Sequence, residues 1–416
     1  MYKRQDQWSE LNYNDIDIIT NGFVDEFKLA VNNLKANNAA GGSRTGSFAY
    51  FGAGSGTSPL PIYMAYLRGA AGNPNSPSSY TGSNWTSTSF TNDMVFVNPS
   101  PGNSAADLDG SSTFRANAIA AGLPANFLVL NPAVDDVNVY DSGAYSDYHA
   151  LQVEVRRRLS RGLFANLSYQ YAHEGGSAFD GFYYGREMVP SANVRHAIKT
   201  QWDWTLPVGR GMRYGTDMNP WMDGLLGGWS FRGTGRAQAR MMNFGNVRLV
   251  GMTAKDLQKM YKYYTIDNDT APFKSIYMLP EDVRQNTRAA FTTSSTSLNG
   301  YGTALGPPTG RYIAPSNSPD CLQLRAGDCS PRTLLIRAPY FVRFDIGLSK
   351  RFALKGASSI EVSFEMLNVF DNINFNPVAN PGTSADIFRV TSAYTDASNT
   401  YDPGGRLGQV MFRINW

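Results

Sequence analysis

The chain has few cysteines and histidines, no long apolar run and little net charge, and each shortage excludes a class of protein. No stretch of its 416 residues approaches 18 uninterrupted apolar residues, which excludes membrane-spanning helices. The 37 basic and 34 acidic residues leave a net charge of +3, too small to indicate a nucleic-acid partner. Both cysteines are far from the three histidines, His149, His173 and His196, so we predict no metal site and no cofactor.

Apolar and aromatic residues, by contrast, are abundant. Apolar residues make up 42% of the chain, which excludes general disorder. The 23 Tyr, 23 Phe and 7 Trp, together with 40 Gly, form a mixture that suits a β-barrel. The length alone allows either a couple of soluble domains or one large barrel.

The last ten residues alternate in polarity. Four apolar side chains share one face of an extended chain: Val410, Phe412, Ile414 and Trp416. Ten residues at strand rise can cross an outer-membrane hydrocarbon layer when the strand is tilted. The pattern predicts the final strand of a membrane β-barrel, with the terminal aromatic residue as the signal that the bacterial insertion machinery recognises. One alternating strand would also suit a soluble β-sandwich.

Six further segments alternate in the same way, which gives seven predicted strands. They are residues 146–159, 162–173, 193–206, 228–238, 340–352 and 359–367. Tight connections at 160–161 and 353–358 indicate hairpins. If Trp416 ends in the periplasm, both tight turns are periplasmic and the long connections are external, which is the polarity of outer-membrane barrels. Only the link at 207–227 is longer than such periplasmic turns usually are.

Aromatic residues gather toward the strand ends, where membrane interfaces favour them. A periplasmic aromatic girdle is predicted from Trp202, Trp204, Trp229 and Phe352, beside Trp416. A soluble sandwich has no reason to sort aromatic residues by strand end.

Residues 1–145 are expected to hold early barrel strands and an extracellular loop, and residues 146–416 the C-terminal barrel strands. Helical spacing of apolar residues predicts a helix near 21–34. The segments 59–67 and 94–97 are possible strands or loop-packing segments. In the large extracellular loop at 239–339, Thr253 and Pro280 mark predicted helix starts. A folded loop of this size indicates ligand capture or a lid.

Aromatic residues of the loops are candidates for ligand contact, although packing of one loop against another explains them equally well. The named candidates are Phe182, Tyr183, Tyr184, Tyr301 and Tyr312. Cys321 and Cys329 lie close together in a loop-like stretch, which favours a disulfide in an oxidising compartment.

An enzyme is a further class of function. A lipase-like arrangement would require Ser146 and His149 to meet, but residues three apart in a strand lie on opposite faces. Residues 107–112 resemble a calcium loop but lack its third ligand and terminal glutamate, so a turn is expected. We therefore predict no enzymatic activity. Charged side chains on the polar strand faces are expected to pair between neighbouring strands: Arg343, Asp345, Glu361 and Glu365.

The first eight residues contain no apolar signal segment and no small-residue cleavage site, so nothing in them would export the chain. An outer-membrane protein has to be exported. We therefore expect a mature or partial chain whose export signal lies on a preceding portion.

Several segments resemble the C-terminal part of TonB-dependent outer-membrane receptors, especially the Oar-like group with an N-terminal carboxypeptidase-regulatory-like domain. Residues 365–375, Glu-Met-Leu-Asn-Val-Phe-Asp-Asn-Ile-Asn-Phe, are similar to the late-barrel pattern E-x-L-N-x-F-N…N-F. Asp371 takes the place of the usual Asn. Stretches that begin at Leu11, Tyr148, Val194, Asn246 and Gly306 are similar too, so the resemblance covers most of the chain.

The resemblance implies an all-β fold, the C-terminal part of an antiparallel transmembrane barrel of about 22 strands, in the bacterial cell outer membrane. It also implies uptake of a bulky, scarce ligand or export of a surface molecule, energised through TonB. The implied partners are outer-membrane lipid, the barrel insertion machinery, an unknown ligand, and the TonB complex through a missing N-terminal part. The alternative is a non-transporting adhesin or structural barrel, which a complete gene without a plug and TonB box would favour.

Overall fold

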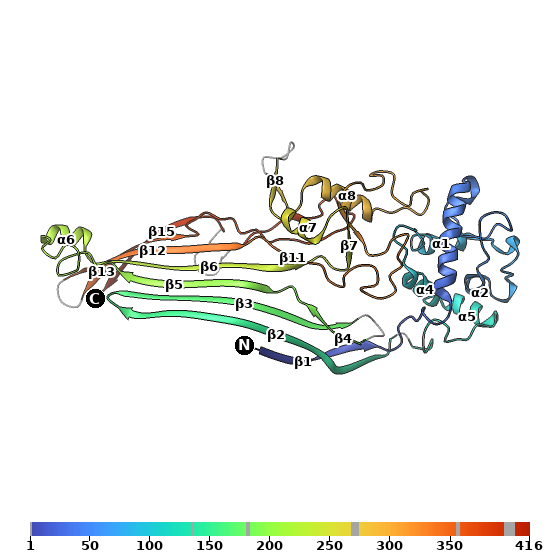
Figure 1. Ribbon diagram of the computed structural model, residues 1–416, viewed down its shortest axis with the longest axis horizontal. Coiled ribbons are helices and arrows are strands. Elements are labelled where there is room, and N and C mark those ends of the chain that lie inside the picture. Colours follow the sequence, from blue (N-terminus) through green and yellow to red (C-terminus); the bar gives the residue numbers. More distant parts are fainter. Residues whose placement is uncertain (1, 135, 180–183, 268–273, 355–357, 395–403) are drawn as a thin grey trace.

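Long strands of alternating polarity assemble into one ten-stranded antiparallel sheet, which extends from one end of the molecule to a group of helices at the other end (Figure 1). A computed structural model describes residues 2–134, 136–179, 184–267, 274–354, 358–394 and 404–416. The strand order is β1-β2-β3-β5-β6-β12-β13-β15, with β4 paired to β3 and β11 paired to β6. The bounds are β1 Tyr2–Asn12, β2 Asn138–Ser160, β3 Leu163–Phe179, β4 Tyr184–Pro190, β5 Val194–Thr205, β6 Trp229–Asn243, β11 Leu335–Arg337, β12 Phe341–Ala353, β13 Ser359–Leu367 and β15 Leu407–Asn415.

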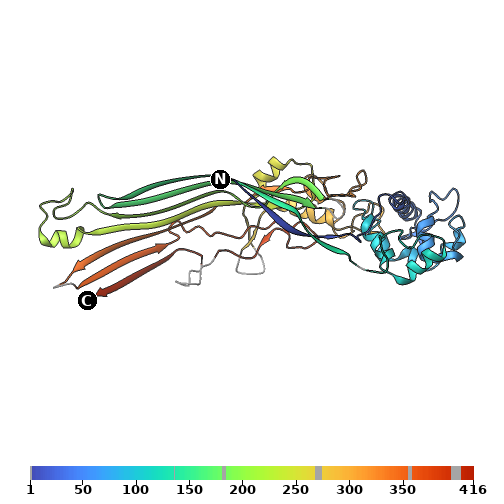
Figure 2. The same cartoon turned by 90° about the horizontal axis from the view of Figure 1, so that it is seen from below.

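All seven predicted strands are confirmed, as β2, β3, β5, β6, β12, β13 and β15. Strand β1 lies in residues 1–145, where early barrel strands were expected, but its bounds were not predicted, because its residues are largely polar on both faces and show no alternation. In the described part of the chain, β1 pairs only with β2 and β15 only with β13, so the sheet is open. Seen from below, the C-terminal strands lie at a different level from β2 and β3, so the sheet is curved (Figure 2).

The two ends of the sheet differ. At the end that we call the turn end, β2 and β3 are joined by a tight hairpin with Arg161 and Gly162 at φ 52° and 75°. Helix α6 (Pro220–Leu226) and the C-terminus lie at this same end (Figure 1). The long link at 207–227 thus folds into a short helix at the turn end. At the opposite end, the cap end, the long connections fold into two regions with separate hydrophobic cores.

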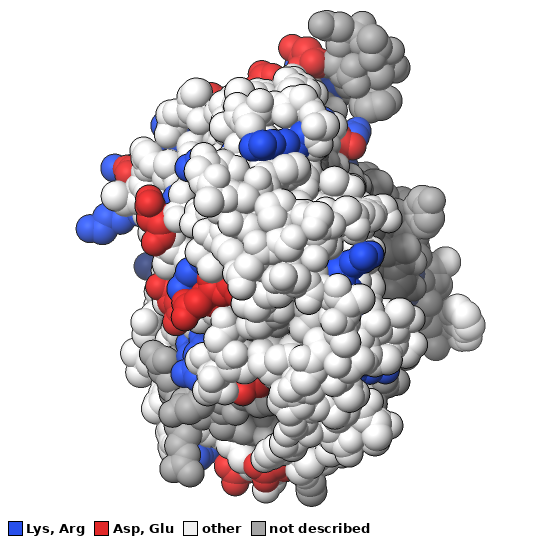
Figure 3. Space-filling model, turned by 90° about the vertical axis from the view of Figure 1, so that its right-hand side faces the viewer, with Lys and Arg blue, Asp and Glu red and all other residues white. Residues whose placement is uncertain are grey.

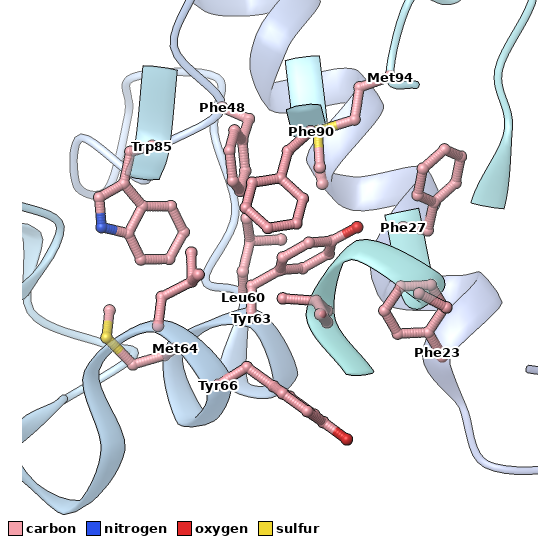
Figure 4. Packing of buried hydrophobic residues seen from close by; sticks show 14 of the residues in the cluster. Phe23, Phe27, Phe48, Leu60, Tyr63, Met64, Tyr66, Trp85, Phe90 and Met94 are labelled. Atoms are coloured by element: carbon pink, nitrogen blue, oxygen red, sulfur yellow. The ribbon is translucent and has the colours of Figure 1, made fainter. Parts of the chain in front are cut away.

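The first of these regions, the helical cap, comprises residues 13–134 between β1 and β2. Its helices are α1 Phe23–Ala40, α2 Pro61–Arg68, α3 Thr88–Thr91, α4 Pro101–Asp109 and α5 Ser112–Ala120. Aromatic side chains from α1, α2, α3 and the loops around them fill one core (Figure 4). Within it, Phe48 lies 5.0 Å from Trp85 and 5.3 Å from Tyr63 between ring centroids.

Two segments of the cap were predicted as possible strands or loop-packing segments. Residues 59–67, a possible strand, contribute to helix α2, because Pro61 occupies the first helical position, where its missing N–H costs nothing. Residues 94–97 are a loop-packing segment, the second of the two predicted alternatives, and Met94 and Val95 occupy buried positions of the loop. Helix α1 overlaps the helix expected near 21–34 but extends to Ala40.

The second region, the loop core, comprises residues 244–338 and 374–394. Its elements are β7 Val247–Val250, α7 Ala254–Met260, β8 Tyr264–Ile266, β9 Ser275–Tyr277, α8 Glu281–Phe291, β10 Tyr312–Pro315 and β14 Arg389–Val390. Both predicted helix starts are confirmed: Thr253 forms a capping box with Asp256, and Pro280 is the N-cap of α8. No helix among the described residues is long and apolar enough to cross a membrane.

Candidate functional site: the polar face of the sheet

The two faces of the sheet carry different side chains, and the strand registers fix which residues stand together. On the polar face, two adjacent rows cross β2, β3, β5, β6 and β12. The first row is Arg156, Asn166, Gln201, Thr234 and Asp345, and the second is Glu154, Ser168, Lys199, Arg236 and Arg343. Charged and amide side chains from distant parts of the sequence thus form one continuous surface.

A cavity of about 550 Å³ lies over these rows. Its polar lining comes from Asn166, Ser168, Lys199, Gln201, Thr234, Arg236, Arg343 and Asp345, and Phe341 and Tyr394 add aromatic rings. Tyr394 belongs to the loop core, so a cap-end loop closes one side of a cavity whose floor is the sheet. This mixture of donors, acceptors and rings can bind a polar ligand of moderate size.

Ion pairs and ring contacts hold the basic residues of the cavity in place. The guanidinium of Arg343 donates to Asp345 at 3.1 Å and lies 5.5 Å from the ring centroid of Tyr394. Arg236 lies 5.8 Å from the centroid of Phe341 and donates to Gln238 at 2.9 Å. Arginine over an aromatic face is stabilised by the ring quadrupole, so these side chains are oriented without a ligand.

A second cavity, of about 320 Å³, continues the polar face toward the turn end. There Arg232 donates to Glu365 at 2.5 Å, and Gln409 donates to the other carboxylate oxygen at 2.7 Å. Nearby, Arg413 lies 4.0 Å from Glu361. The expected pairing of charges between neighbouring strands therefore occurs for Glu361 of β13 and Arg413 of β15. Glu365 instead pairs with Arg232 of β6, two strands away across Gly347 of β12, and Arg343 pairs with Asp345 on its own strand.

The segment 365–375, which carries the family resemblance, has a structural role that its sequence did not reveal. Asn368 is fully buried at φ 49° and donates to the carbonyl oxygens of Asn372 and Gly404. Its N–H donates to Asp345 at 2.7 Å. Asn374 exchanges two hydrogen bonds with the backbone of Val342. The asparagines therefore secure the chain leaving β13 to the cap end of β12, beside the cavity.

The opposite, apolar face bears the residues predicted as an aromatic girdle, all near the turn end. One row contains Trp204, Phe231, Leu348, Phe364 and Val410, and the next contains Trp229, Lys350, Val362 and Phe412. Trp202 lies 5.8 Å from Phe231, and Trp229 lies 6.3 Å from Phe364. Phe352 pairs with Ile360 and lies two residues closer to the turn end than Lys350, which pairs with Trp229.

Close packing on this face requires glycine at two positions of β6. A Cβ at Gly233 would lie 2.3 Å from the ring of Trp202, and one at Gly235 would lie 2.3 Å from the ring of Phe344. Aromatic side chains of β5 and β12 therefore lie across β6. In β15, Val410, Phe412 and Ile414 share the apolar face, and Phe412 is 73% exposed.

The aromatic residues proposed for ligand contact are not brought together at the cavity. Phe182 and Tyr183 lie outside the described residues, and Tyr184 begins β4 opposite Phe179. Tyr301 and Tyr312 lie near each other in the loop core, away from the cavity lining. Burial raises the pKa of Tyr301, Tyr312 raises it further and Arg248 lowers it, as for a residue packed within a loop region.

Other candidates from the sequence occupy separate places. Cys321 and Cys329 form a disulfide in the loop core. On β2, Ser146 accepts a hydrogen bond from Gln7 at 3.3 Å, whereas the ring of His149 lies 4.8 Å from Tyr2. Residues 107–109 form the end of helix α4 rather than a turn. In the described parts of the chain, no group of three or more His, Cys, Asp and Glu could hold a metal ion.

Sequence reasoning missed most of the cavity lining. Thr234, Phe341 and Tyr394 had no distinguishing motif, because they meet only through strand register and loop folding. The available signal was the alternation of polar residues in each predicted strand, since it assigns Lys199, Gln201 and Arg343 to the polar face of their strands.

A family model described as an outer membrane beta barrel domain matches residues 78–409, which is 332 of the 416 residues. No curated protein matches the chain.

Proposed function

The chain belongs to the outer membrane beta barrel domain family of the bacterial outer membrane, and we propose that it is the C-terminal barrel portion of a TonB-dependent receptor. In this proposal the turn end is periplasmic and the cap end is extracellular. The receptor takes up a bulky ligand, or exports a surface molecule, with energy supplied through TonB. Its Oar-like character rests on the resemblance of residues 365–375.

The observation that carries the proposal is the open, two-sided sheet. An unpaired strand edge in lipid would leave backbone N–H and C=O groups without partners, so an open sheet needs further strands. Because β1 and β15 both present such edges in the described chain, the sheet supports membership of a larger barrel. A barrel of about 22 strands has a wide lumen that a plug fills, as TonB-dependent transport requires.

The cap end supports ligand capture. Two folded regions, the helical cap and the loop core, stand at this end, and the polar cavity lies between the sheet and Tyr394 of the loop core. Viewed from the cap end, the surface is mostly uncharged, with acidic and basic residues scattered across it (Figure 3). Such a surface favours a largely neutral ligand over a strongly charged one.

We further propose a binding and transport role without enzymatic activity. Its partners would be outer-membrane lipid, the barrel insertion machinery, TonB through an N-terminal part, and an unidentified ligand. Ser146 and His149 support this view, because Ser146 accepts a hydrogen bond from Gln7 whereas the ring of His149 lies against Tyr2.

The complete gene and its TonB contact test the proposal. We expect upstream coding sequence for an export signal, a plug with a TonB box, and further alternating strands. The purified full receptor should then bind the periplasmic domain of TonB, and deletion of the TonB box should abolish that binding. A complete gene without a plug and TonB box would overturn the proposal and leave the adhesin or structural barrel.

A further inference from the structure

Helix α6 at the turn end presents apolar side chains outward. Trp221 is 90% exposed and Leu225 is 70% exposed, although the helix is fixed firmly at both ends. At its start, the side chain of Asn219 accepts a hydrogen bond from Met222 at 2.8 Å. At its end, the indole of Trp229 donates to the carbonyl oxygen of Leu225 at 2.9 Å. Exposed apolar residues on a fixed element indicate a binding surface.

A pocket of about 410 Å³ separates α6 from the strands beneath it. The helix contributes Pro220, Trp221, Gly224 and Leu225, and the strands contribute Trp229, Lys350 and Phe352. All three strand residues lie on the apolar face, because Trp229 pairs with Lys350 and Phe352 follows two residues later. The pocket is therefore continuous with the face that an outer membrane barrel turns toward lipid.

The pocket also contains a cation. Lys350 is only 4% exposed, and its ammonium donates to the carbonyl oxygens of Gly227 at 2.6 Å and Asp223 at 3.3 Å. It lies 5.3 Å from the ring of Phe352 and 5.6 Å from that of Trp229. Within the described residues, no carboxylate forms an ion pair with Lys350. The carboxylate of Asp223 acts on this charge through space only, since its oxygen accepts a hydrogen bond from the N–H of Arg210 instead of binding the ammonium. A buried charge is stabilised by a counter-charge in direct contact, and Lys350 has room for one in this pocket.

We propose that α6 and the strand residues beneath it form a binding site for a phospholipid of the inner leaflet of the outer membrane. One acyl chain lies against Trp221, Leu225 and Phe352, and the phosphodiester neutralises Lys350. Lipid is favoured over a protein partner because the site continues the lipid-facing band and lies at its periplasmic edge, where phospholipid head groups are found. The site rests on the barrel's orientation in the membrane and is independent of TonB-dependent transport.

Single fluorescent labels locate α6 relative to the bilayer. The two native cysteines are joined in a disulfide, so Trp221→Cys, Asp217→Cys and Phe364→Cys each create one free thiol for an environment-sensitive label. The full chain is studied in isolated outer membranes loaded with phospholipid that carries a quencher on its acyl chain. Position 364 lies in the apolar band, and position 217 is exposed in the same periplasmic link as α6.

We expect at least threefold stronger acyl-chain quenching at 221 than at 217, approaching the value at 364. Quenching at 364 but not at 221 would overturn the proposal. If 221 were then also shielded from aqueous iodide, a protein partner would cover α6. Absence of quenching at both 221 and 364 would overturn the membrane orientation together with the proposal.

Lys350 tests the phosphate contact. Native mass spectrometry of the full chain released from membranes should show a bound phospholipid, and Lys350→Met should lower the bound fraction several-fold. Lys350→Arg, which keeps the charge, should restore it, and Lys255→Met, at an exposed position of α7, should leave it unchanged. Equal phospholipid retention by Lys350→Met and the unmodified chain would overturn the role of Lys350.

Discussion

The helical cap and the sheet place their apolar side chains in opposite ways. In the cap, aromatic residues converge on a core in which Trp85 is 1% exposed and Tyr63 is fully buried. In the sheet, residues of the same kind stand outward, and Leu151, Phe364 and Phe412 are largely exposed. Both regions are equally rich in apolar residues, so the difference lies in what surrounds them.

Apolar side chains are buried where the surrounding solvent is water. A whole sheet face of apolar side chains can remain on the surface only where the surroundings are themselves apolar, as in a lipid bilayer. The cap is folded against water, as any soluble domain is. The sheet presents one face suited to lipid and one face suited to water, and its polar cavity lies on the water-facing side. Substitutions in the cap and on each face of the sheet therefore distinguish a surface that contacts water from one that contacts lipid.

The cap should depend on its core. Trp85→Ala removes a ring that contacts Phe48 and Tyr80, and it should destabilise the cap by about 3–5 kcal/mol. Protease digestion of intact cells should then cut the cap, while the sheet stays in the membrane. Trp221→Ala, the same substitution at a 90% exposed site, should leave the cap resistant. Equal resistance of both variants would contradict a separately folded cap.

The apolar face should reject charge and the polar face should accept it. Ile198→Arg places a cation near the middle of β5 on the apolar face, which should cost about 2–4 kcal/mol in a bilayer. Gln201→Arg, three residues away on the polar face, should cost little. Urea unfolding in lipid vesicles measures both variants. A larger loss from Gln201→Arg would reverse the assignment of the faces.

The cap should lose stability as the pH rises from about 5 to about 8. Burial raises the pKa of Glu26 from 4.5 to about 7, although N–H groups of Ile62 and Tyr63 at 2.8 Å lower it. Below 4.5 the carboxyl is protonated in both states. Between 4.5 and about 7 only the carboxyl of the unfolded chain ionises, which favours the unfolded state. The free energy of unfolding of the cap therefore falls by at most about 3 kcal/mol as the pH rises.

Protease resistance of the cap at pH 5 and pH 8 measures this loss. In Glu26→Gln the difference between the two pH values should shrink, but it should not vanish. Part of the difference should remain in this variant because of Asp93, whose pKa is also raised to about 7 by burial and by Asp107. Asp25→Asn, at an exposed neighbouring position, should keep the full difference. Greater resistance at pH 8 than at pH 5 would contradict the assigned direction.

Ion pairs on the water-facing side of the sheet should contribute least to the free energy of unfolding. Arg232 and Glu365 are both partly exposed, and such pairs contribute about 0–1 kcal/mol. Glu365→Gln should therefore shift the unfolding midpoint in urea only slightly, with Gln409→Ala as a control for the second hydrogen bond. A loss comparable to that of Ile198→Arg would mean that this side of the sheet is not solvated.

The strands could be predicted from sequence because alternation is a local property. In β13, Ile360, Val362 and Phe364 differ from their neighbours regardless of what the rest of the chain does. The helix starts at Thr253 and Pro280 were equally local. The proline at position 61 disfavours a strand, but it also favours the first turn of a helix, and this second property was not used in the prediction for residues 59–67.

The cavity could not be predicted in the same way, because its residues meet through register and loop packing. Nothing in the sequence around Tyr394 indicates that it lies over Arg343 from β12. The bounds of strand β1 escaped prediction because its partner β2 follows more than a hundred residues later and its own side chains do not alternate. The pocket beneath α6 depends on Trp229 and Lys350, which are distant in sequence and adjacent in the sheet.

Cysteine substitution along β5 tests the two-sided sheet most directly. In isolated outer membranes, a water-soluble thiol reagent should modify cysteines at Lys199, Gln201 and Asp203, which face the polar side. It should fail to modify those at Ile198, Trp202 and Trp204, which face the apolar side. A period of two in reactivity would establish lipid on one face and water on the other. Uniform reactivity along the strand, or the reversed pattern, would contradict a lipid-facing sheet.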